Sequence, residues 1–457
     1  MLRVTIKPHR EYLRASADTQ KLFVMLKLLP TPETAQDRPR VHIALVIDTS
    51  GSMREPAPGS AGEIVPVAPF TVDGKTYNAT FEGTTKLDIA MDAARRLVSS
   101  AALRPDDTVS IIQFDDDSTL VAEGQVGANR EQLLAGIDAL TRHSGGTLMG
   151  KGLLVAAEAL GQAEQVARKV LLLTDGRAVD ELDCRDAAET LARLHTPIVA
   201  LGVGEEYNED LLSDLCSTTQ GRPYDFRDMT ALPGIFETEL GAVTRQVVED
   251  VRLTVRTVRD VRLVSAMRAY PNLADIDAAQ EPLPLGNVEA GDYTIFILEF
   301  DLQGRPPVRA RLAQLGITYL VTAQGYRGEN PPDDLVVEFT EDEALAAAVD
   351  SEVMGYVQQR NVDSLVRQAT EQAKSNPEQA ARTLQVARSM TQRLGNAGMT
   401  QALGQAVDEL RGNGTIKIGT VKTIKLGART QTMKAGGPDV VPDTIPSDEE
   451  IRKITGA

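Results

Sequence analysis

Oxygen-bearing side chains gather at the end of an apolar stretch near the N-terminus. Residues 41–47 read Val-His-Ile-Ala-Leu-Val-Ile, a run rich in β-branched residues that is typical of a buried strand. Asp48 ends the run, and Ser50 and Ser52 follow at alternate positions around a glycine. A carboxylate and two hydroxyls are hard ligands that suit a small divalent cation such as Mg²⁺. The sequence therefore predicts a cation site beyond the end of this strand.

Two later segments supply further oxygen ligands. Thr147 follows two glycines, and Asp175 follows an apolar run and precedes another glycine. A lone Asp-x-Ser-x-Ser would also fit an ordinary capped turn, but the later residues occur in the order of a known motif. The set resembles the metal-ion-dependent adhesion site (MIDAS) of the von Willebrand factor A (vWA) domain, over roughly residues 40–245. All five positions of that motif are matched, by Asp48, Ser50, Ser52, Thr147 and Asp175.

The resemblance implies how these residues share the cation. In the vWA family the serine and threonine hydroxyls touch the ion, which assigns Ser50, Ser52 and Thr147 to direct ligation. The aspartates hold the ion partly through water, which assigns Asp48 and Asp175 to the supporting shell. Mg²⁺ is the expected ion, with Mn²⁺ or Ca²⁺ as alternatives. An acidic side chain of a partner protein fills the open coordination position in the family, so the implied function is Mg²⁺-dependent protein binding.

Alternating strand and helix patterns predict the scaffold of this site. Strands are expected at 41–47, 108–114 and 170–174, and a helix with one apolar face is expected at 86–98. Such alternation predicts an α/β fold with a doubly wound, mostly parallel sheet and helices on both faces. Strand 41–47 should lie between the other two, which places its end at a switch point where such sheets bind ligands. Asp115, Asp116 and Asp117 follow a neighbouring strand and are expected either as a solvated turn or as an acidic rim.

The flanking segments predict a second domain. Strands at 2–6 and 21–29 precede the vWA-like region, and period-two patterns return after it. We therefore expect residues 1–39 and 246–340 to form one β-sandwich into which residues 40–245 are inserted. Within the vWA-like region, residues 54–85 form an insertion whose Asp-Gly pair predicts a β-hairpin.

The C-terminal part is expected to be a small helical bundle over residues 341–412, followed by a flexible tail over 413–457. The tail begins as a basic, threonine-rich segment and becomes acidic. Basic residues beside threonines suit a Ser/Thr kinase, although strand pairing through the apolar residues and an inert tail are alternatives. The candidate phosphorylation sites are Thr415, Thr420, Thr423, Thr430 and Thr432.

Composition narrows the function further. A net charge of −17 over 457 residues argues against nucleic-acid or anionic-membrane binding. The two cysteines form no disulfide framework, and neither a signal peptide nor an apolar run of membrane-spanning length is recognisable. The four histidines are scattered, and no serine lies in a catalytic triad spacing, so we expect no enzyme. The sequence thus suggests a cytoplasmic vWA protein of the bacterial intracellular type.

Three functions remain open from the family resemblance. The first is an adaptor or scaffold in a bacterial multi-component signalling or conflict system that includes Ser/Thr kinases. The second is a partner of a MoxR-type AAA+ ATPase in protein-complex assembly or metal insertion. The third, a cell-surface adhesion or channel-associated protein, is disfavoured because signal and membrane segments are not recognisable.

Overall fold

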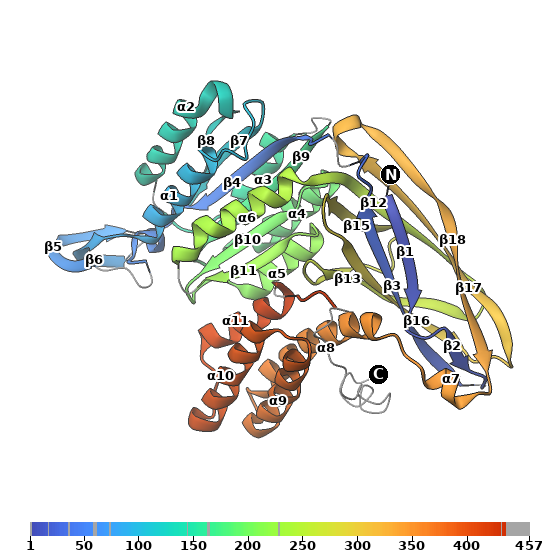
Figure 1. Ribbon diagram of the computed structural model, residues 1–457. Helices are drawn as coiled ribbons and strands as arrows, with labels where there is room; N and C mark the ends of the chain where they lie inside the picture. Colours follow the sequence, from blue (N-terminus) through green and yellow to red (C-terminus); the bar gives the residue numbers. More distant parts are fainter. Residues whose placement is uncertain are drawn as a thin grey trace. The chain divides into compact units, whose positions relative to one another are not determined.

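The chain forms two compact units (Figure 1). One unit comprises Ala35–Glu249 with Val321–Tyr326, and the other comprises Met1–Thr34, Asp250–Leu320 and Arg327–Ala457. The computed structural model describes residues 2–16, 18–34, 37–57, 62–72, 75–143, 145–161, 165–226, 229–430 and 432–435, with the backbone alone for 62–82.

The first unit is built on a six-stranded sheet with the order β11-β10-β9-β4-β7-β8. The central strand β4 (Arg40–Asp48) lies parallel to β7 (Thr108–Phe114) on one side and to β9 (Val166–Thr174) on the other, in the order that the alternating pattern predicts. β4 is buried from Val41 onward and β9 along its whole length, which explains the apolar runs 43–47 and 170–173 within them. The remaining strands are β8 (Ser118–Gln125), antiparallel to β7, and the parallel strands β10 (Ile198–Val203) and β11 (Arg222–Phe226).

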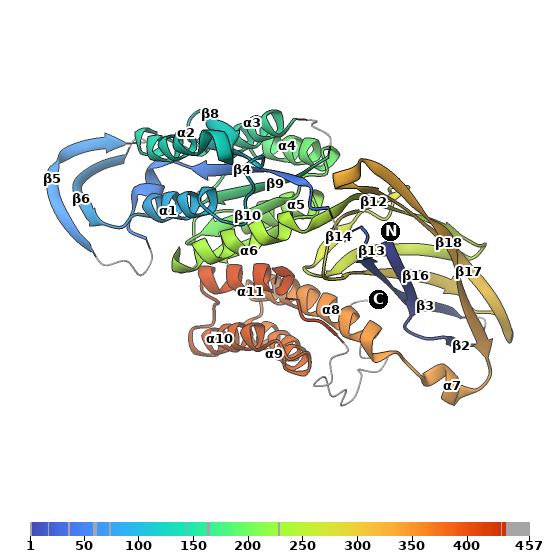
Figure 2. The same cartoon turned by 45° about the horizontal axis from the view of Figure 1, so that its top comes forward.

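Helices cover both faces of this sheet (Figure 2). Alternate residues of β4, beginning at Val41, share one apolar core with α1, α2 and α6. α3 contacts β4 and β7 and packs closely against α4, outside that core. The helices are α1 (Lys86–Val98), α2 (Val126–Ala139), α3 (Met149–Leu160), α4 (Glu181–Arg193), α5 (Glu209–Thr218) and α6 (Leu232–Thr244), with short 3₁₀ helices η1 (Gly51–Arg54), η2 (Leu140–Arg142) and η3 (Met229–Ala231). The hairpin expected within 54–85 is formed by β5 (Gly62–Val72) and β6 (Lys75–Gly83), whereas its Asp-Gly turn lies outside the described residues.

The second unit contains two five-stranded sheets, with the orders β1-β3-β16-β13-β14 and β15-β12-β17-β18-β2. β3 (Thr19–Pro30) pairs antiparallel with β16 (Thr294–Gln303) over ten consecutive residue pairs. Strands from before and after the first unit therefore share each sheet. The other strands are β1 (Leu2–Pro8), β2 (Tyr12–Arg14), β12 (Gln246–Thr257), β13 (Val261–Tyr270), β14 (Ala274–Ile276), β15 (Leu283–Glu289), β17 (Val308–Val321) and β18 (Tyr326–Thr340). The 3₁₀ helix η4 (Thr322–Gln324), between the last two strands, and the first four residues of β12 belong to the first unit.

A helical bundle completes the second unit. It contains α8 (Ser351–Gln372), α9 (Pro377–Arg393), α10 (Ala397–Asn413) and α11 (Ile418–Thr430), and the short α7 (Glu343–Ala347) precedes it. The start of α8 packs against the sheet that holds β3 and β16, where Val353 and Tyr356 are fully buried.

The expectation of a flexible tail from residue 413 is wrong for α11. Gly414 adopts a left-handed conformation at φ 71° and ends α10, so the chain turns back. Ile424 and Ala428, four residues apart, then lie in the core of the bundle. Beyond the helix, the side-chain amide of Gln359 both donates to and accepts from the backbone of Met433, at 2.6 and 2.7 Å. The apolar positions of the tail therefore follow a helical period, not that of a strand or a linker.

A buried ion pair ties α6 to β9 in the first unit. Lys169 Nζ lies 2.8 Å from Glu239 Oε2, and the two side chains are only 7% and 3% exposed. Arg222 and the Tyr224 hydroxyl contact the other carboxylate oxygen at 3.3 and 2.7 Å. Burial opposes ionisation of Glu239, but the charges of Lys169 and Arg222 outweigh it and lower the pKa to about 2.

This pair yields a stability prediction. Glu239→Leu should lower the free energy of unfolding by about 3–5 kcal/mol in urea titrations, because Lys169 would remain buried without its counter-ion. The Lys169→Met/Glu239→Leu double variant should recover most of that loss. The folded-state pKa lies below the ordinary 4.5, so the wild-type contribution is complete above pH 4.5 and is lost as the pH falls toward 2. A single variant as stable as the wild type at pH 7 would contradict this account.

Candidate metal centre

The five predicted residues come together at one edge of the six-stranded sheet. Asp48 is the last residue of β4, and Asp175 directly follows β9. Because β4 and β9 are parallel neighbours, their carboxyl ends lie side by side. Ser50 lies in the turn that leads into η1, Ser52 lies within η1, and Thr147 lies in the loop before α3.

Short contacts join these side chains. Ser52 Oγ donates a hydrogen bond to Asp175 Oδ1 at 2.7 Å, and the hydroxyls of Ser50 and Ser52 are 3.1 Å apart. Thr147, in the loop before α3, lies close to the residue that follows Asp175. A Cβ placed on Gly176 would be 2.9 Å from Thr147 Oγ1. Gly176 is therefore needed for this close approach. The sequence motif and the spatial cluster contain the same five residues.

Asp48 is held rigidly beneath the hydroxyls. Its Oδ1 accepts a hydrogen bond from the backbone N–H of Ser50 at 2.9 Å, and its Oδ2 accepts one from Thr174 Oγ1 at 2.7 Å. The side chain is fully buried, and this burial, together with the nearby charge of Asp175, raises its pKa to about 7. Two buried carboxylates whose charges repel each other favour a nearby cation.

The donor set fits a hard divalent cation. Among the described residues, no group of three or more His, Cys, Asp or Glu side chains is arranged to hold a metal ion. The oxygen donors of this cluster are two carboxylates and the hydroxyls beside them. Neighbouring oxygens around octahedral Mg²⁺ are about 3.0 Å apart when the metal–oxygen distance is about 2.1 Å. The oxygen pairs Ser52–Asp175 at 2.7 Å and Ser50–Ser52 at 3.1 Å are hydrogen-bonded at separations close to that value. The donor set is therefore compatible with the ion that the sequence predicts.

Lys86, the first residue of α1, also reaches this cluster. Its Nζ lies 2.7 Å from Asp175 Oδ2, 3.3 Å from the carbonyl oxygen of Ser52 and 3.1 Å from Glu55 Oε2. Its side chain is 12% exposed, whereas that of Glu55 is 54% exposed. The ammonium group thus bridges a candidate ligand and a solvent-facing carboxylate. Nothing in the spacing of the motif signals this residue.

The aspartates after β7 hold the loop that carries Thr147. Gly146 N–H donates to Asp116 Oδ1 at 2.9 Å, and Leu148 N–H donates to the carbonyl oxygen of Asp115 at 2.8 Å. Asp115 is buried and accepts a hydrogen bond from the backbone of Asp117. This turn therefore positions the third loop of the site, while Asp116 and Asp117 remain exposed beside it.

The five candidate threonines lie elsewhere, in and around α11. Thr420 is buried and donates to Glu409 at 2.9 Å. Thr423 and Thr430 donate to helix carbonyl oxygens, and Thr432 donates to the carbonyl oxygen of Pro271. Thr415, in the loop between α10 and α11, is the exposed member of the set.

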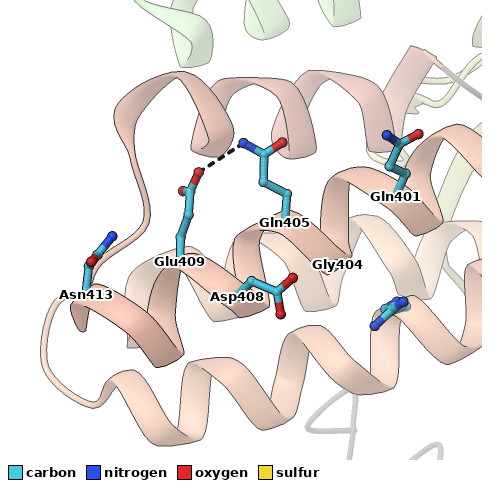
Figure 3. A pocket seen from close by; sticks show the side chains of 7 residues that line it. Gln401, Gly404, Gln405, Asp408, Glu409 and Asn413 are labelled. Atoms are coloured by element: carbon cyan, nitrogen blue, oxygen red, sulfur yellow. Dashed lines mark hydrogen bonds between the residues drawn. The ribbon is translucent and has the colours of Figure 1, made fainter.

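An open polar hollow of about 500 Å³ lies on the bundle beside α10 (Figure 3). Glu409 on its wall accepts hydrogen bonds from Gln405, from Thr420 and from the backbone N–H of Lys417. Its carboxylate is thus engaged in fixing the start of α11. The lining residues are Arg388, Gln401, Gly404, Gln405, Asp408, Glu409 and Asn413.

Comparisons with known proteins agree with this architecture. Residues 42–238 match the family model of the von Willebrand factor type A domain. An uncharacterized protein from Synechocystis sp. is 25% identical over 213 residues, which are 46% of this chain and 43% of that protein. The aligned region thus spans less than half of that relative. None of the described helices is long and apolar enough to cross a membrane.

Two solved structures share the fold over nearly the whole chain. The von Willebrand factor type A protein from Catenulispora acidiphila superposes with a TM-score of 0.76 at 16% identity, covering 94% of this chain and 97% of that one. The ArnB paralog VWA2 from Sulfolobus acidocaldarius gives a TM-score of 0.58 at 16% identity, with coverages of 95% and 99%. At this identity the likeness concerns the fold. Residues 42–238 therefore form a von Willebrand factor type A domain.

Proposed function

We propose that the chain is a Mg²⁺-dependent protein-binding adaptor or scaffold that captures an acidic residue of a partner protein. The observation that carries this proposal is the convergence of Asp48, Asp175 and the hydroxyls of two loops at one edge of the vWA sheet. vWA domains are generally protein-interaction modules, so binding is favoured over catalysis.

The five residues of the site would have different roles in holding the ion. The ion would be ligated by the hydroxyls of Ser50, Ser52 and Thr147. Ser52 and Thr147 are partly exposed, so the site is open to solvent. The buried Asp48 and Asp175 would hold it from beneath, and the hydrogen bond from Thr174 keeps Asp48 oriented. The bound ion supplies a Lewis-acidic position that accepts a carboxylate oxygen. Mg²⁺ suits this role because it retains water in part of its shell, and Mn²⁺ or Ca²⁺ are the alternatives.

The proposed setting is the cytoplasm, in a multi-component signalling or conflict system. Both cysteines are buried and neither forms a disulfide bond, which fits a reducing compartment. The alternative partner is a MoxR-type AAA+ ATPase. The two settings can be separated by affinity capture of partner proteins in Mg²⁺, elution with EDTA and identification by mass spectrometry. An AAA+ ATPase among the eluted proteins would favour the second setting, and components of a kinase system would favour the first.

Asp48→Asn provides the most direct test of the metal site. We expect it to abolish Mg²⁺ binding in calorimetry and to weaken partner capture by roughly 30- to 4000-fold, the equivalent of about 2–5 kcal/mol. It should also raise the melting temperature of the metal-free protein, because it removes a buried charge that faces Asp175. Asp117→Asn, at an exposed carboxylate near the same edge, is the matched control. Equal capture by the wild type in Mg²⁺ and in EDTA would contradict the proposal.

Lys86→Gln should have the opposite effect on the affinity of the site for Mg²⁺. The ammonium group contacts Asp175 and repels any cation that the carboxylate holds. Its removal should therefore tighten Mg²⁺ binding by roughly tenfold, or about 1.4 kcal/mol, in calorimetric titrations. Lys86→Arg keeps the charge and should bind no more tightly than the wild type. Weaker binding by Lys86→Gln would show that the lysine supports the ion instead of competing with it.

Phosphorylation by a Ser/Thr kinase is proposed for Thr415 first among the five threonines. Thr415 is exposed and lies between the exposed residues Arg411 and Lys417, whereas Thr420 is buried. Intact-mass and peptide analysis of protein from native cells should find phosphate on Thr415, and Thr415→Ala should remove it. Phosphate on Thr420 in the folded protein would contradict this assignment.

A further inference from the structure

The two most exposed large apolar side chains among the described residues lie beside the candidate metal centre. Val179 is 76% exposed and Leu182 is 78% exposed, and the next highest value is the 63% of Ile418. Both follow Asp175 within seven residues, in the loop between β9 and α4 and at the start of that helix. Isolated exposed apolar residues are common, but two at this level in one four-residue stretch are not.

Hydrogen bonds fix this loop to the segment that carries Thr147. Val179 N–H donates to the carbonyl oxygen of Thr147 at 3.2 Å, and Lys151 N–H donates to Asp180 Oδ2 at 3.0 Å. Close packing adds to this, because a Cβ on Gly150 would lie 2.6 Å from the backbone nitrogen of Cys184. The exposed side chains are therefore presented by a firmly held backbone next to a candidate ligand.

A local structural role does not account for Val179. An apolar residue before a helix cap can pack against the fourth helical residue, which here is Cys184. Cys184 is fully buried, whereas Val179 is 76% exposed, so the two do not form such a contact. Its neighbour Ala178 is buried. Successive side chains therefore alternate between buried and exposed positions here, and Val179 points outward.

Exposed charges differ between the two sides of the centre. Asp116 and Asp117 are exposed on the side of β7 and β8, whereas the segment with Val179 and Leu182 carries exposed charges of both signs, at Arg177 and Asp183. Asp175 and Val179 are four residues apart, so their Cα atoms are at most about 14 Å apart, the span of about four extended residues.

We propose that Val179 and Leu182 form an apolar subsite that binds a large aliphatic or aromatic side chain of the partner, within about four residues of the acidic residue held at the metal. This inference rests on the proposed function and names its partner chemistry: a peptide segment that pairs one carboxylate with a neighbouring apolar side chain. The partner's carboxylate makes its binding depend on the metal ion. The partner's apolar side chain, held against Val179 and Leu182, determines which partners bind.

A peptide selection tests this directly. Random twelve-residue peptides displayed on phage are bound to the immobilised full-length protein in Mg²⁺ and eluted with EDTA. We expect the eluted pool to be enriched in Asp or Glu with Leu, Ile or Phe within four positions. A synthetic peptide from the pool should bind the Val179→Ser/Leu182→Ser variant roughly tenfold or more weakly in fluorescence polarisation. Mg²⁺ affinity and melting temperature should be unchanged, because both side chains are exposed.

The matched control carries Val308→Ser and Ile418→Ser, two exposed apolar residues of the other compact unit. It should bind the peptide as the wild type does. Enrichment of acidic residues without an apolar neighbour, or equal affinity for the Val179→Ser/Leu182→Ser variant, would overturn the subsite and leave the metal-dependent function standing. A pool without acidic residues would overturn both.

Discussion

The site depends on the placement of two carboxylates at the ends of adjacent parallel strands. Asp48 and Asp175 are 0% and 2% exposed, and charges so deeply buried are costly unless something compensates them. Within the chain, the compensation consists of hydroxyl and N–H donors and the ammonium group of Lys86. These groups come from the turn after β4, from β9 and from α1, so the surrounding fold has to bring all three segments to one edge.

The sequence was sufficient to predict the centre of this arrangement. Fully buried parallel strands require continuous apolar runs, so residues 41–47 and 170–174 were recognisable, and their order followed from the alternation of helices and strands. The five motif residues are all short side chains close to strand ends or tight turns, whose positions the backbone largely determines. Their spacing in the sequence therefore translated into proximity in space.

Residues that act through long side chains or tertiary packing could not be predicted in this way. Lys86 is the first residue of an amphipathic helix, a position where a lysine usually faces water, and its direction toward Asp175 depends on the path of the preceding segment. α11 was missed because its threonines, glycines and β-branched residues have weak helical preference, and packing of Ile424 and Ala428 against the bundle overrides that preference. The exposure of Val179 and Leu182 is likewise a tertiary property, since an apolar residue beside a helix cap would ordinarily be expected to pack.

Direct location of the ion tests the central claim most sharply. Crystals of the full-length protein grown in Mn²⁺ can be measured at the manganese absorption edge, where anomalous scattering identifies the metal. The account predicts one strong peak bounded by the hydroxyl oxygens of Ser50, Ser52 and Thr147, with Asp48 and Asp175 beneath it. A peak at another site, or none at this edge of the sheet with Mn²⁺ in excess, would contradict it.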